Sequence, residues 1–395
     1  MQHYKNNSYL ILLTFLCMII FGFIENIKGT VIPPIREQFN VTYGSIGIML
    51  LVSSLGYLGT TLVGGFVGDK FGQKKVLIFG FLLTILACIS FIFTKSFIAV
   101  VILFFLVNAG FGCFEVAVNS LGAQIFVRNS AVMMNLMHLF YGLGSSAGPK
   151  YAGWILIRDI PWQYTYFYSL ILIVSVFIFL CFSSFPQRKL EDSRNKASFK
   201  DLISSKKIWL FVGVLGFCEV IELGTGNWLV NFLQQVRGMD AGNSSFYLTL
   251  FFITFTIGRL VGGYLAEKLG YVQIIFYFTI ITIVLFIGGL ILDNKFAFLF
   301  SLMGFFVSIM FPTVMAIIMK EFTVGTSSVM GFIITVSGSV NMVSNWVVGK
   351  TNDYLGVFTG FSSLAVYTGL ILVFLTLLDR KLTFNKPGII RQNQN

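Results

Sequence analysis

The sequence predicts an all-α membrane protein, with twelve transmembrane helices arranged as two pseudo-symmetric six-helix bundles. Two observations of composition predict the membrane class: 56% of the 395 residues are hydrophobic and only 11% are charged. A soluble domain carries about a quarter charged residues, so no soluble core could bury this much apolar surface. A third observation predicts the helices, because apolar runs of roughly 20 residues recur along the chain and each can cross a hydrocarbon layer ~30 Å thick.

Twelve helices separated by short polar segments account for the apolar runs. We expect them at residues 8–33, 45–68, 75–94, 97–125, 131–157, 163–185, 207–236, 243–267, 272–292, 296–320, 326–350 and 357–378. The first run follows a single lysine, Lys5, and lacks a small-residue cleavage site, so we expect a span rather than a removed signal peptide. All five cysteines lie inside apolar runs without paired or metal-type spacing, which predicts no metal site.

The basic residues predict the direction in which the helices cross the membrane. If the N-terminus is cytoplasmic, most basic residues fall in cytoplasmic segments, including a cluster over 188–207 and the C-terminal tail. The segments on the other side keep only Arg36, Lys95, Arg158, Arg237, Lys295 and Lys350. Both termini are therefore expected on the cytoplasmic side of the inner membrane. The net charge of +11 reflects this topology, and no nucleic-acid partner is expected.

An internal repeat divides the chain into two halves. The sequence GGFVGDKFG at 64–72 returns as GGYLAEKLG at 262–270, at the same end of the second span of each half. The longest polar stretch lies between the two copies. Two parallel halves of six spans are typical of secondary transporters. The predicted divisions are an N-terminal bundle over 1–186, a cytoplasmic linker over 187–206, a C-terminal bundle over 207–380 and a cytoplasmic tail over 381–395.

The loop between the second and third spans resembles the loop motif of the Major Facilitator Superfamily. The residues that carry the resemblance are Gly65, Asp69, Lys70, Gly72, Lys74 and Lys75, and Glu267 is the equivalent acid in the second copy. Glycines let two helices approach closely, while the acid and bases can latch the cytoplasmic face. The resemblance implies a monomeric transporter, not an enzyme, whose partners are a small-molecule substrate and the lipid bilayer. No cofactor is expected, because a proton gradient would supply the energy.

Ionisable side chains inside a span are costly, so each marks a candidate functional site. Glu115 has Asn119 one helical turn later, which makes Glu115 the first candidate for a proton carrier. Glu219 and Glu222 are three residues apart, and two like charges so close do not both ionise cheaply. One of them is therefore the second candidate. The alternative for this pair is a structural ion pair with a lysine or arginine of another span.

Three further charged residues inside spans have a structural role as the alternative to a role in transport. Glu25 and Lys28 share one helix face, as either a structural ion pair or part of a proton or substrate site. Arg259 is expected to act as a gate residue.

Amide and aromatic side chains indicate the kind of cargo. Hydrogen-bonding amides beside an apolar ring suit a neutral polyol, although amides can also simply hold helices together. Asn227 and Asn231 share one helix face, as do Asn341 and Asn345. The candidate substrate-binding residues are Asn119, His138, Asn227, Trp228, Asn231, Asn345, Lys28 and Lys150.

Three segments narrow the resemblance within the superfamily. Residues 110–119, 135–149 and 219–233 are similar to the fucose:proton symporter and bacterial glucose/mannose permease lineage. Fucose symporters carry an aspartate in the first span where this chain has Gly29, which favours a glucose-type relative. The resemblance implies proton-coupled uptake of a sugar or similar small polar solute. The alternative is a proton-antiport exporter of drugs, because Gly144, Gly148 and Pro149 partly resemble the glycine-proline motif of such antiporters.

Overall fold

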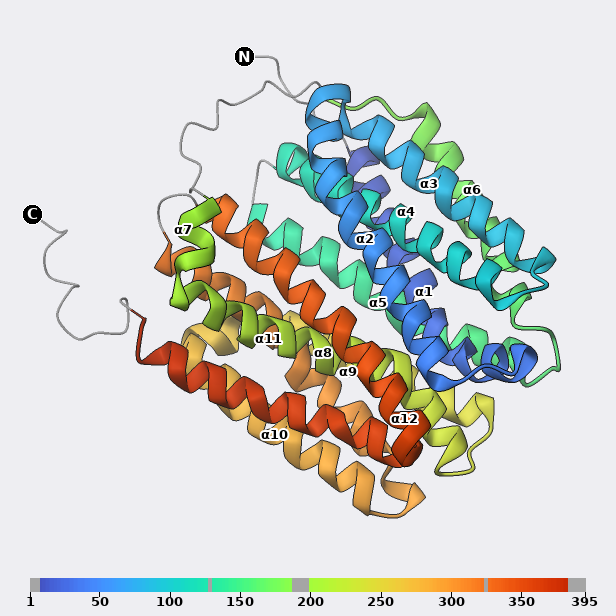
Figure 1. The fold of residues 1–395 in the computed structure, drawn as a ribbon. Coiled ribbons are helices and arrows are strands. Elements are labelled where there is room, and N and C mark those ends of the chain that lie inside the picture. Colours follow the sequence, from blue (N-terminus) through green and yellow to red (C-terminus); the bar gives the residue numbers. More distant parts are fainter. Residues whose placement is uncertain (1–7, 127–129, 187–198, 323–325, 383–395) are drawn as a thin grey trace, which may run out of the picture.

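The computed structural model describes residues 8–126, 130–186, 199–322 and 326–382, and Figure 1 shows the fold. In these ranges all regular structure is helical, as expected in lipid, where a helix satisfies its own backbone groups. The N-terminal half contains α1 (Ser8–Phe39), α2 (Tyr43–Phe71), α3 (Gln73–Ser90), η1 (Phe91–Phe93), α4 (Phe97–Ile125), α5 (Ser130–Leu156) and α6 (Gln163–Phe182). The short α7 (Phe199–Ser204) precedes α8 (Lys206–Gln235), α9 (Ala241–Leu269), α10 (Tyr271–Ile291), η2 (Asn294–Phe296), α11 (Phe298–Glu321) and α12 (Thr326–Asp379).

The long helix α12 supplies two spans. Gly356, with φ +83°, interrupts its helical geometry between them. Within the described ranges, ten helices are long and apolar enough to cross a membrane, counting α12 once. The glycine- and serine-rich α5, 27 residues long, runs beside α1 and completes the set. The predicted all-helical membrane fold with twelve spans is confirmed.

The predicted end of the first helix is wrong. We expected α1 to stop at Pro33, but it continues through Pro33 and Pro34 to Phe39. Two prolines remove two backbone donors, which usually breaks a helix. In membrane proteins, prolines are tolerated inside a helix that packs against neighbouring helices. Here Ile32 and Ile35, on either side of the proline pair, are completely buried, so the helix is packed on both sides of the prolines.

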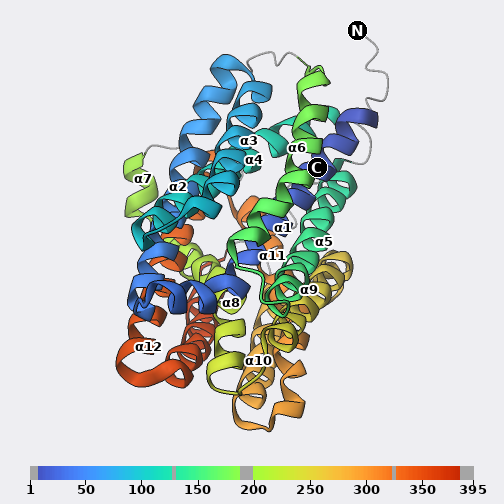
Figure 2. The ribbon, with the colours of Figure 1, turned by 90° about the vertical axis from the view of Figure 1, so that its right-hand side faces the viewer.

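The two halves meet mainly through three pairs of helices: α1 with α8, α2 with α12, and α5 with α9 (Figures 1 and 2). We call the end of the bundle at which α1 begins and α12 ends the terminal face, and the end at which α2 begins the opposite face. Close approaches between halves lie at mid-bundle and toward the opposite face. A Cβ on Gly29 would lie 1.9 Å from the Gly226 carbonyl oxygen, and one on Gly349 would lie 2.5 Å from that of Tyr43.

A carboxylate joins the halves at the opposite face. Asp353 of α12 accepts hydrogen bonds of 2.7 Å from each of the first two backbone N–H groups of α2, those of Tyr43 and Gly44. These donors have no partner within their own helix, and the positive end of the helix dipole favours an anion there. The closed end of the bundle is therefore held by a helix cap that crosses from one half to the other.

Candidate functional site

Side chains from both halves lie around one guanidinium at mid-bundle. Arg259 of α9 lies with its Nη2 atom 3.9 Å from Glu222 Oε1 of α8, and its guanidinium lies 4.5 Å from the ring centre of Phe255. The guanidinium also lies 5.9 Å from the ring centre of Tyr141 of α5, in the N-terminal half. Glu115 and His138 of that half lie at longer electrostatic range from Arg259. We call these side chains, Arg259, Glu222, Tyr141, Glu115 and His138, together with Glu25, Tyr57 and Glu219, the acid cluster.

Glu115 is held by the amide that follows it one turn later. Asn119 Nδ2 donates to Glu115 Oε1 at 2.7 Å and to the Glu115 backbone carbonyl at 2.8 Å. Both side chains are partly exposed within the bundle. Asn119 therefore orients the Glu115 carboxylate. The carboxyl group can gain or lose a proton while it stays hydrogen-bonded to Asn119.

Tyr57 of α2 is a member of the acid cluster that sequence reasoning missed. It lies within electrostatic reach of Glu25, Glu115, Glu219 and Tyr141. A tyrosine in an apolar run is neither charged nor titrates near neutral pH, so Tyr57 does not stand out in the sequence. Its place near the midpoint of the second span was the one available signal.

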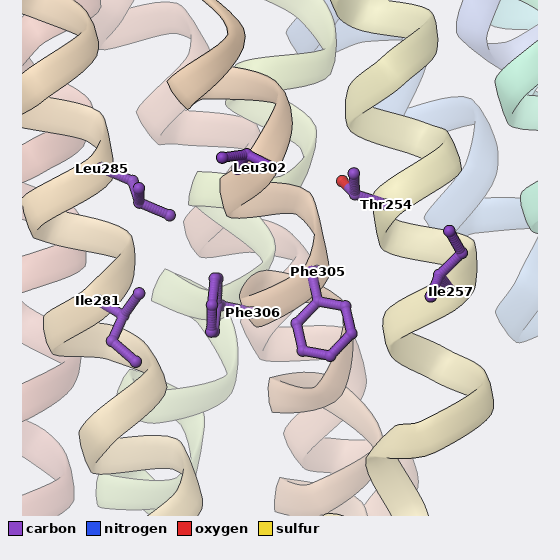
Figure 3. A pocket seen from close by; sticks show the side chains of 7 residues that line it. All are labelled: Thr254, Ile257, Ile281, Leu285, Leu302, Phe305 and Phe306. Atoms are coloured by element: carbon purple, nitrogen blue, oxygen red, sulfur yellow. The ribbon is translucent and has the colours of Figure 1, made fainter.

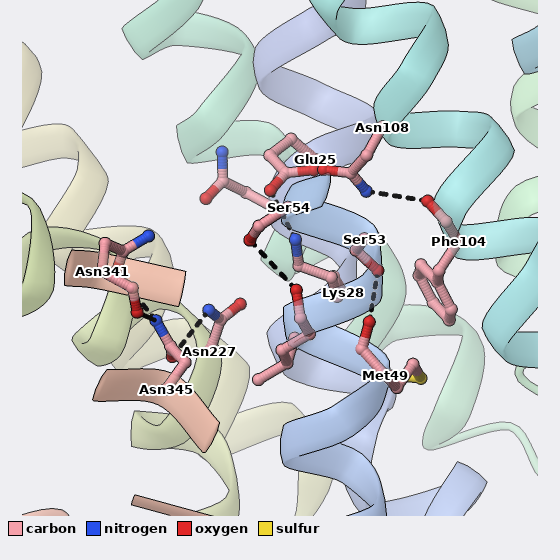
Figure 4. Close-up of polar contacts among 12 residues, drawn as sticks. Glu25, Lys28, Met49, Ser53, Ser54, Phe104, Asn108, Asn227, Asn341 and Asn345 are labelled. Carbon is pink, nitrogen blue, oxygen red and sulfur yellow. Dashed lines mark hydrogen bonds and ion pairs between the residues drawn. The ribbon is translucent and has the colours of Figure 1, made fainter. Parts of the chain in front are cut away.

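Glu25 and Lys28 pair with each other on α1. Lys28 Nζ lies 2.5 Å from Glu25 Oε1, and both side chains are largely buried. Between them, Asn26 donates to Ser145 Oγ of α5 at 3.0 Å and so ties α1 to α5. Figure 4 places this ion pair on the N-terminal side of the interface, near Ser54 of α2. Glu25 and Lys28 thus form the structural ion pair considered from the sequence, and both partners belong to α1.

A second polar group, which we call the amide layer, consists of Asn227, Trp228, Asn341 and Asn345. Asn345 Oδ1 accepts from Asn227 Nδ2 at 3.1 Å, and Asn345 Nδ2 donates to Asn341 Oδ1 at 2.8 Å (Figure 4). Asn345 Oδ1 also accepts from Trp228 Nε1 at 3.2 Å. These bonds link α8 to α12 next to the interface. Asn231, one turn after Asn227, is buried close to Tyr43 of α2.

Lys150 does not join either group. It is exposed on α5, with its Nζ atom 5.0 Å from the ring centre of Phe246 on α9. A long lysine side chain near the end of a span can reach the membrane interface in this way. The structure therefore separates Lys150 from the other candidate substrate residues.

The loop-motif residues make contacts inside their own halves. Gly72, with φ +93°, turns the chain between α2 and α3, and Lys74 Nζ donates to the Cys181 carbonyl at the end of α6 at 2.8 Å. Lys70 lies 5.2 Å from the ring centre of Phe71. In the second copy, the Tyr271 hydroxyl donates to Glu267. Gly65 has open space around it, and the Asp69 side chain lies outside the described part of the structure.

An apolar cavity of about 370 Å³ lies elsewhere, between α9, α10 and α11 (Figure 3). Its polar lining residue, Thr254, already donates to the Ser301 carbonyl at 2.5 Å. Ile257 and Leu302, which also line it, are exposed on the outer surface of the bundle. This cavity faces lipid and is separate from the acid cluster and the amide layer.

The fold and the paired halves agree with a comparison of the sequence with protein-family models. The model described as Major Facilitator Superfamily matches residues 14–345. The chain belongs to this superfamily. It is therefore a multi-pass membrane transporter of small molecules and not an enzyme.

Several curated relatives are similar at low identity. The glucose/mannose transporter GlcP of Bacillus subtilis is 23% identical over 365 residues, which cover 87% of this chain and 90% of the relative. The L-fucose-proton symporter of Escherichia coli is 21% identical over 397 residues, 89% of each chain. The cis,cis-muconate transport protein of Acinetobacter baylyi is 23% identical over 274 residues, 66% of each chain. The predicted resemblance to the fucose and glucose/mannose lineage is confirmed.

Solved structures share the fold. A bacterial homolog of the human lysosomal transporter Spinster, in an inward-facing and unoccupied conformation, superposes with a TM-score of 0.82 at 13% identity over 98% of this chain and 99% of that one. The Escherichia coli fucose:proton symporter superposes with a TM-score of 0.65 at 18% identity over 94% of this chain and 99% of that one.

Proposed function

We propose that this transporter takes up a sugar or similar small polar solute together with protons, by alternating access. The observation that carries the proposal is the position of Arg259, which lies 3.9 Å from Glu222 of its own half and 5.9 Å from the ring centre of Tyr141 of the other half, with Glu115 of that half at longer electrostatic range. A carboxylate that alternates between charged and neutral forms changes its attraction for a guanidinium, and this change acts across the interface between the halves. The names of GlcP and the L-fucose-proton symporter support both the solute class and the ion.

Glu115 is proposed as the main proton carrier, with Glu219 and Glu222 as the second site and Glu25 as a further acid. When Glu115 is ionised, its attraction for Arg259 favours the approach of the two halves at mid-bundle. Protonation removes that attraction and leaves Asn119 as the partner of the carboxyl group. The amide layer lies beside the same interface and supplies hydrogen-bonding groups for a hydroxylated solute.

We further propose that the terminal face is cytoplasmic, that the protein works as a monomer in the inner membrane, and that the proton gradient replaces any cofactor. The distribution of basic residues supports the orientation. The Asp353 cap and the close glycine contacts at the opposite face then describe a state closed to the outside. Residues 1–186 and 207–380 would move as the two bodies, joined by the linker 187–206.

The experiment is transport by purified protein in liposomes with an imposed pH gradient, offered D-glucose, D-mannose, D-galactose and L-fucose in turn. We expect accumulation of at least one sugar by the unaltered protein. Glu115→Gln should lose gradient-driven accumulation while retaining sugar exchange without a gradient. Glu37→Gln, a change at an exposed carboxylate outside the acid cluster and the loop motif, is the matched control. Full accumulation by Glu115→Gln would exclude Glu115 as the proton carrier. Accumulation driven by a sodium gradient instead of a pH gradient would show that sodium, and not the proton, is the coupling ion.

Proton-driven export of drugs is the second candidate. Gly144 and Gly148 of α5 pack directly on the α1 backbone, where a Cβ would lie 2.1 Å from the Ile19 carbonyl and 2.4 Å from the Phe23 carbonyl. This contact is consistent with a glycine-rich antiporter helix. Extrusion of ethidium from energised cells, without sugar uptake by the same protein in liposomes, would favour export.

A further inference from the structure

Trp228 fixes the direction of the hydrogen bonds in the amide layer. An indole Nε1–H can donate but cannot accept. It donates to Asn345 Oδ1, so the oxygen of the Asn345 amide must face the indole and its nitrogen must face away. That nitrogen donates to both Oδ1 and the backbone carbonyl of Asn341, at 2.8 and 3.1 Å. The orientation of two asparagines that could otherwise turn over is thus set by one tryptophan.

The same direction determines which amide atoms remain for a solute. Asn345 Oδ1 also accepts from Asn227 Nδ2 at 3.1 Å, so both the oxygen and the nitrogen of the Asn345 amide are fully used. Asn227 is left with its carbonyl oxygen, which is an acceptor, and with the second hydrogen of its amide nitrogen, which is a donor. Asn341 is left with its amide nitrogen and with the second lone pair of its Oδ1.

Burial separates Asn227 from the other three residues of the amide layer. Trp228 is 1% exposed, Asn345 4% and Asn341 6%, so none of these three offers a surface to a solute. Asn227 is partly exposed and lies where α8 touches α1, since a Cβ on Gly29 would lie 3.4 Å from the Asn227 Cα atom. In Figure 4 the Asn227 amide faces the half that carries Lys28. The sequence predicts that Trp228 and Asn345 contact the solute, whereas their burial suits support of the Asn227 amide beside them.

We propose that Trp228 and Asn345 are positioning residues that fix the Asn227 amide, with its Oδ1 as an acceptor and its second Nδ2 hydrogen as a donor, and that this pair selects neutral solutes with neighbouring hydroxyl groups. The inference rests on the proposed function and names its recognition atoms. A hydroxyl both donates and accepts, so two neighbouring hydroxyls satisfy both atoms. A carboxylate only accepts and would leave Asn227 Oδ1 unpaired, while an ammonium group only donates and would leave the second Nδ2 hydrogen of Asn227 unpaired.

The first test needs no solute. The melting temperature in detergent is measured for Trp228→Phe, Asn345→Leu and the double variant. Because both single changes break the same chain of bonds, the double variant should lose clearly less than the sum of the two. Trp346→Phe, on the same helix as Asn345, is the matched control and should add to Asn345→Leu. Additive losses for Trp228 and Asn345 would overturn the inference whatever the protein transports.

The second test measures selectivity with D-glucose and analogues in which one hydroxyl is replaced by fluorine, which can accept weakly but cannot donate. For the unaltered protein, we expect the half-saturating concentration to rise about two- to tenfold for one analogue, the usual range for one hydrogen bond. In Trp228→Phe the Asn345 amide is free to turn, so this ratio should fall toward one. An unchanged ratio in that variant, with only a lower maximal rate, would overturn the inference. If the unaltered protein takes up no sugar, the proposed function fails, while the melting test still decides the positioning roles.

Discussion

Replacing Asp353 by alanine should shift the transporter away from the state described here. Asp353 caps the start of α2 from the other half, with 2.7 Å bonds from the Tyr43 and Gly44 N–H groups. Charge-assisted bonds can be worth more, but Asp353 is exposed, so solvent screens it and the value for an ordinary helix cap applies. Loss of such a cap costs about 1 kcal/mol, which is a factor of about five in an equilibrium constant. Because the halves must separate here for the opposite face to open, this factor should appear in the ratio of the two states.

The assay is the distance distribution between two spin labels at the opposite face. Lys95 of the N-terminal half and Tyr354 of the C-terminal half are both exposed there, and the exposed native Cys181 is first replaced by serine. Asp353→Ala should increase the long-distance population about fivefold. Asp240→Ala removes a cap that lies within one half, and it should leave the distribution unchanged. Equal distributions in Asp353→Ala and the parent, or an equal shift in Asp240→Ala, would refute the role of the cap.

Three further predictions concern single residues. Arg259→Lys keeps the charge but shortens its reach toward Glu222 and Glu115, so gradient-driven sugar accumulation should fall at least tenfold while folding, judged by elution as a single species, is retained. Gly29→Ala should reduce sugar uptake severely, because its Cβ would lie 1.9 Å from a carbonyl oxygen of α8; normal uptake by this variant would contradict the close contact. The backbone N–H of Asn243 donates to the Asp240 carboxylate and lowers the pKa of that group below its usual range. The ionised carboxylate therefore stabilises the folded protein above about pH 4, and this stabilisation is lost as the pH falls through the lowered pKa. Melting temperatures of Asp240→Asn should therefore differ from the parent at pH 7, and the difference should shrink as the pH falls below about 4.

The fold was predictable because lipid leaves few alternatives. Apolar runs of span length must be helices, and a repeated loop motif implies repeated halves. The predicted break between the last two spans coincides with Gly356, where the backbone takes a positive φ. The end of α1 was not predictable, because whether a helix survives Pro33 and Pro34 depends on helices that pack against it from elsewhere in the chain.

Part of the candidate site was predictable for a related reason. Charged residues in apolar runs are conspicuous, so Glu115, Glu222 and Arg259 could be proposed from the sequence alone. Their meeting at one guanidinium could not, because it depends on how α4, α8 and α9 pack. Neutral residues carry no such signal. The sequence therefore did not indicate that Trp228 is buried and donates a hydrogen bond to Asn345, which lies 117 residues away in the chain.

Proton movement during sugar uptake tests the central claim most directly. Liposomes containing the purified protein, without an imposed gradient, receive each of the four sugars while the external pH is recorded in weak buffer. We predict that the sugar that is taken up makes the medium more alkaline, and that Glu115→Gln exchanges that sugar without any pH change. Uptake by the unaltered protein with no pH change, or an undiminished pH change with Glu115→Gln, would contradict proton coupling through the acid cluster.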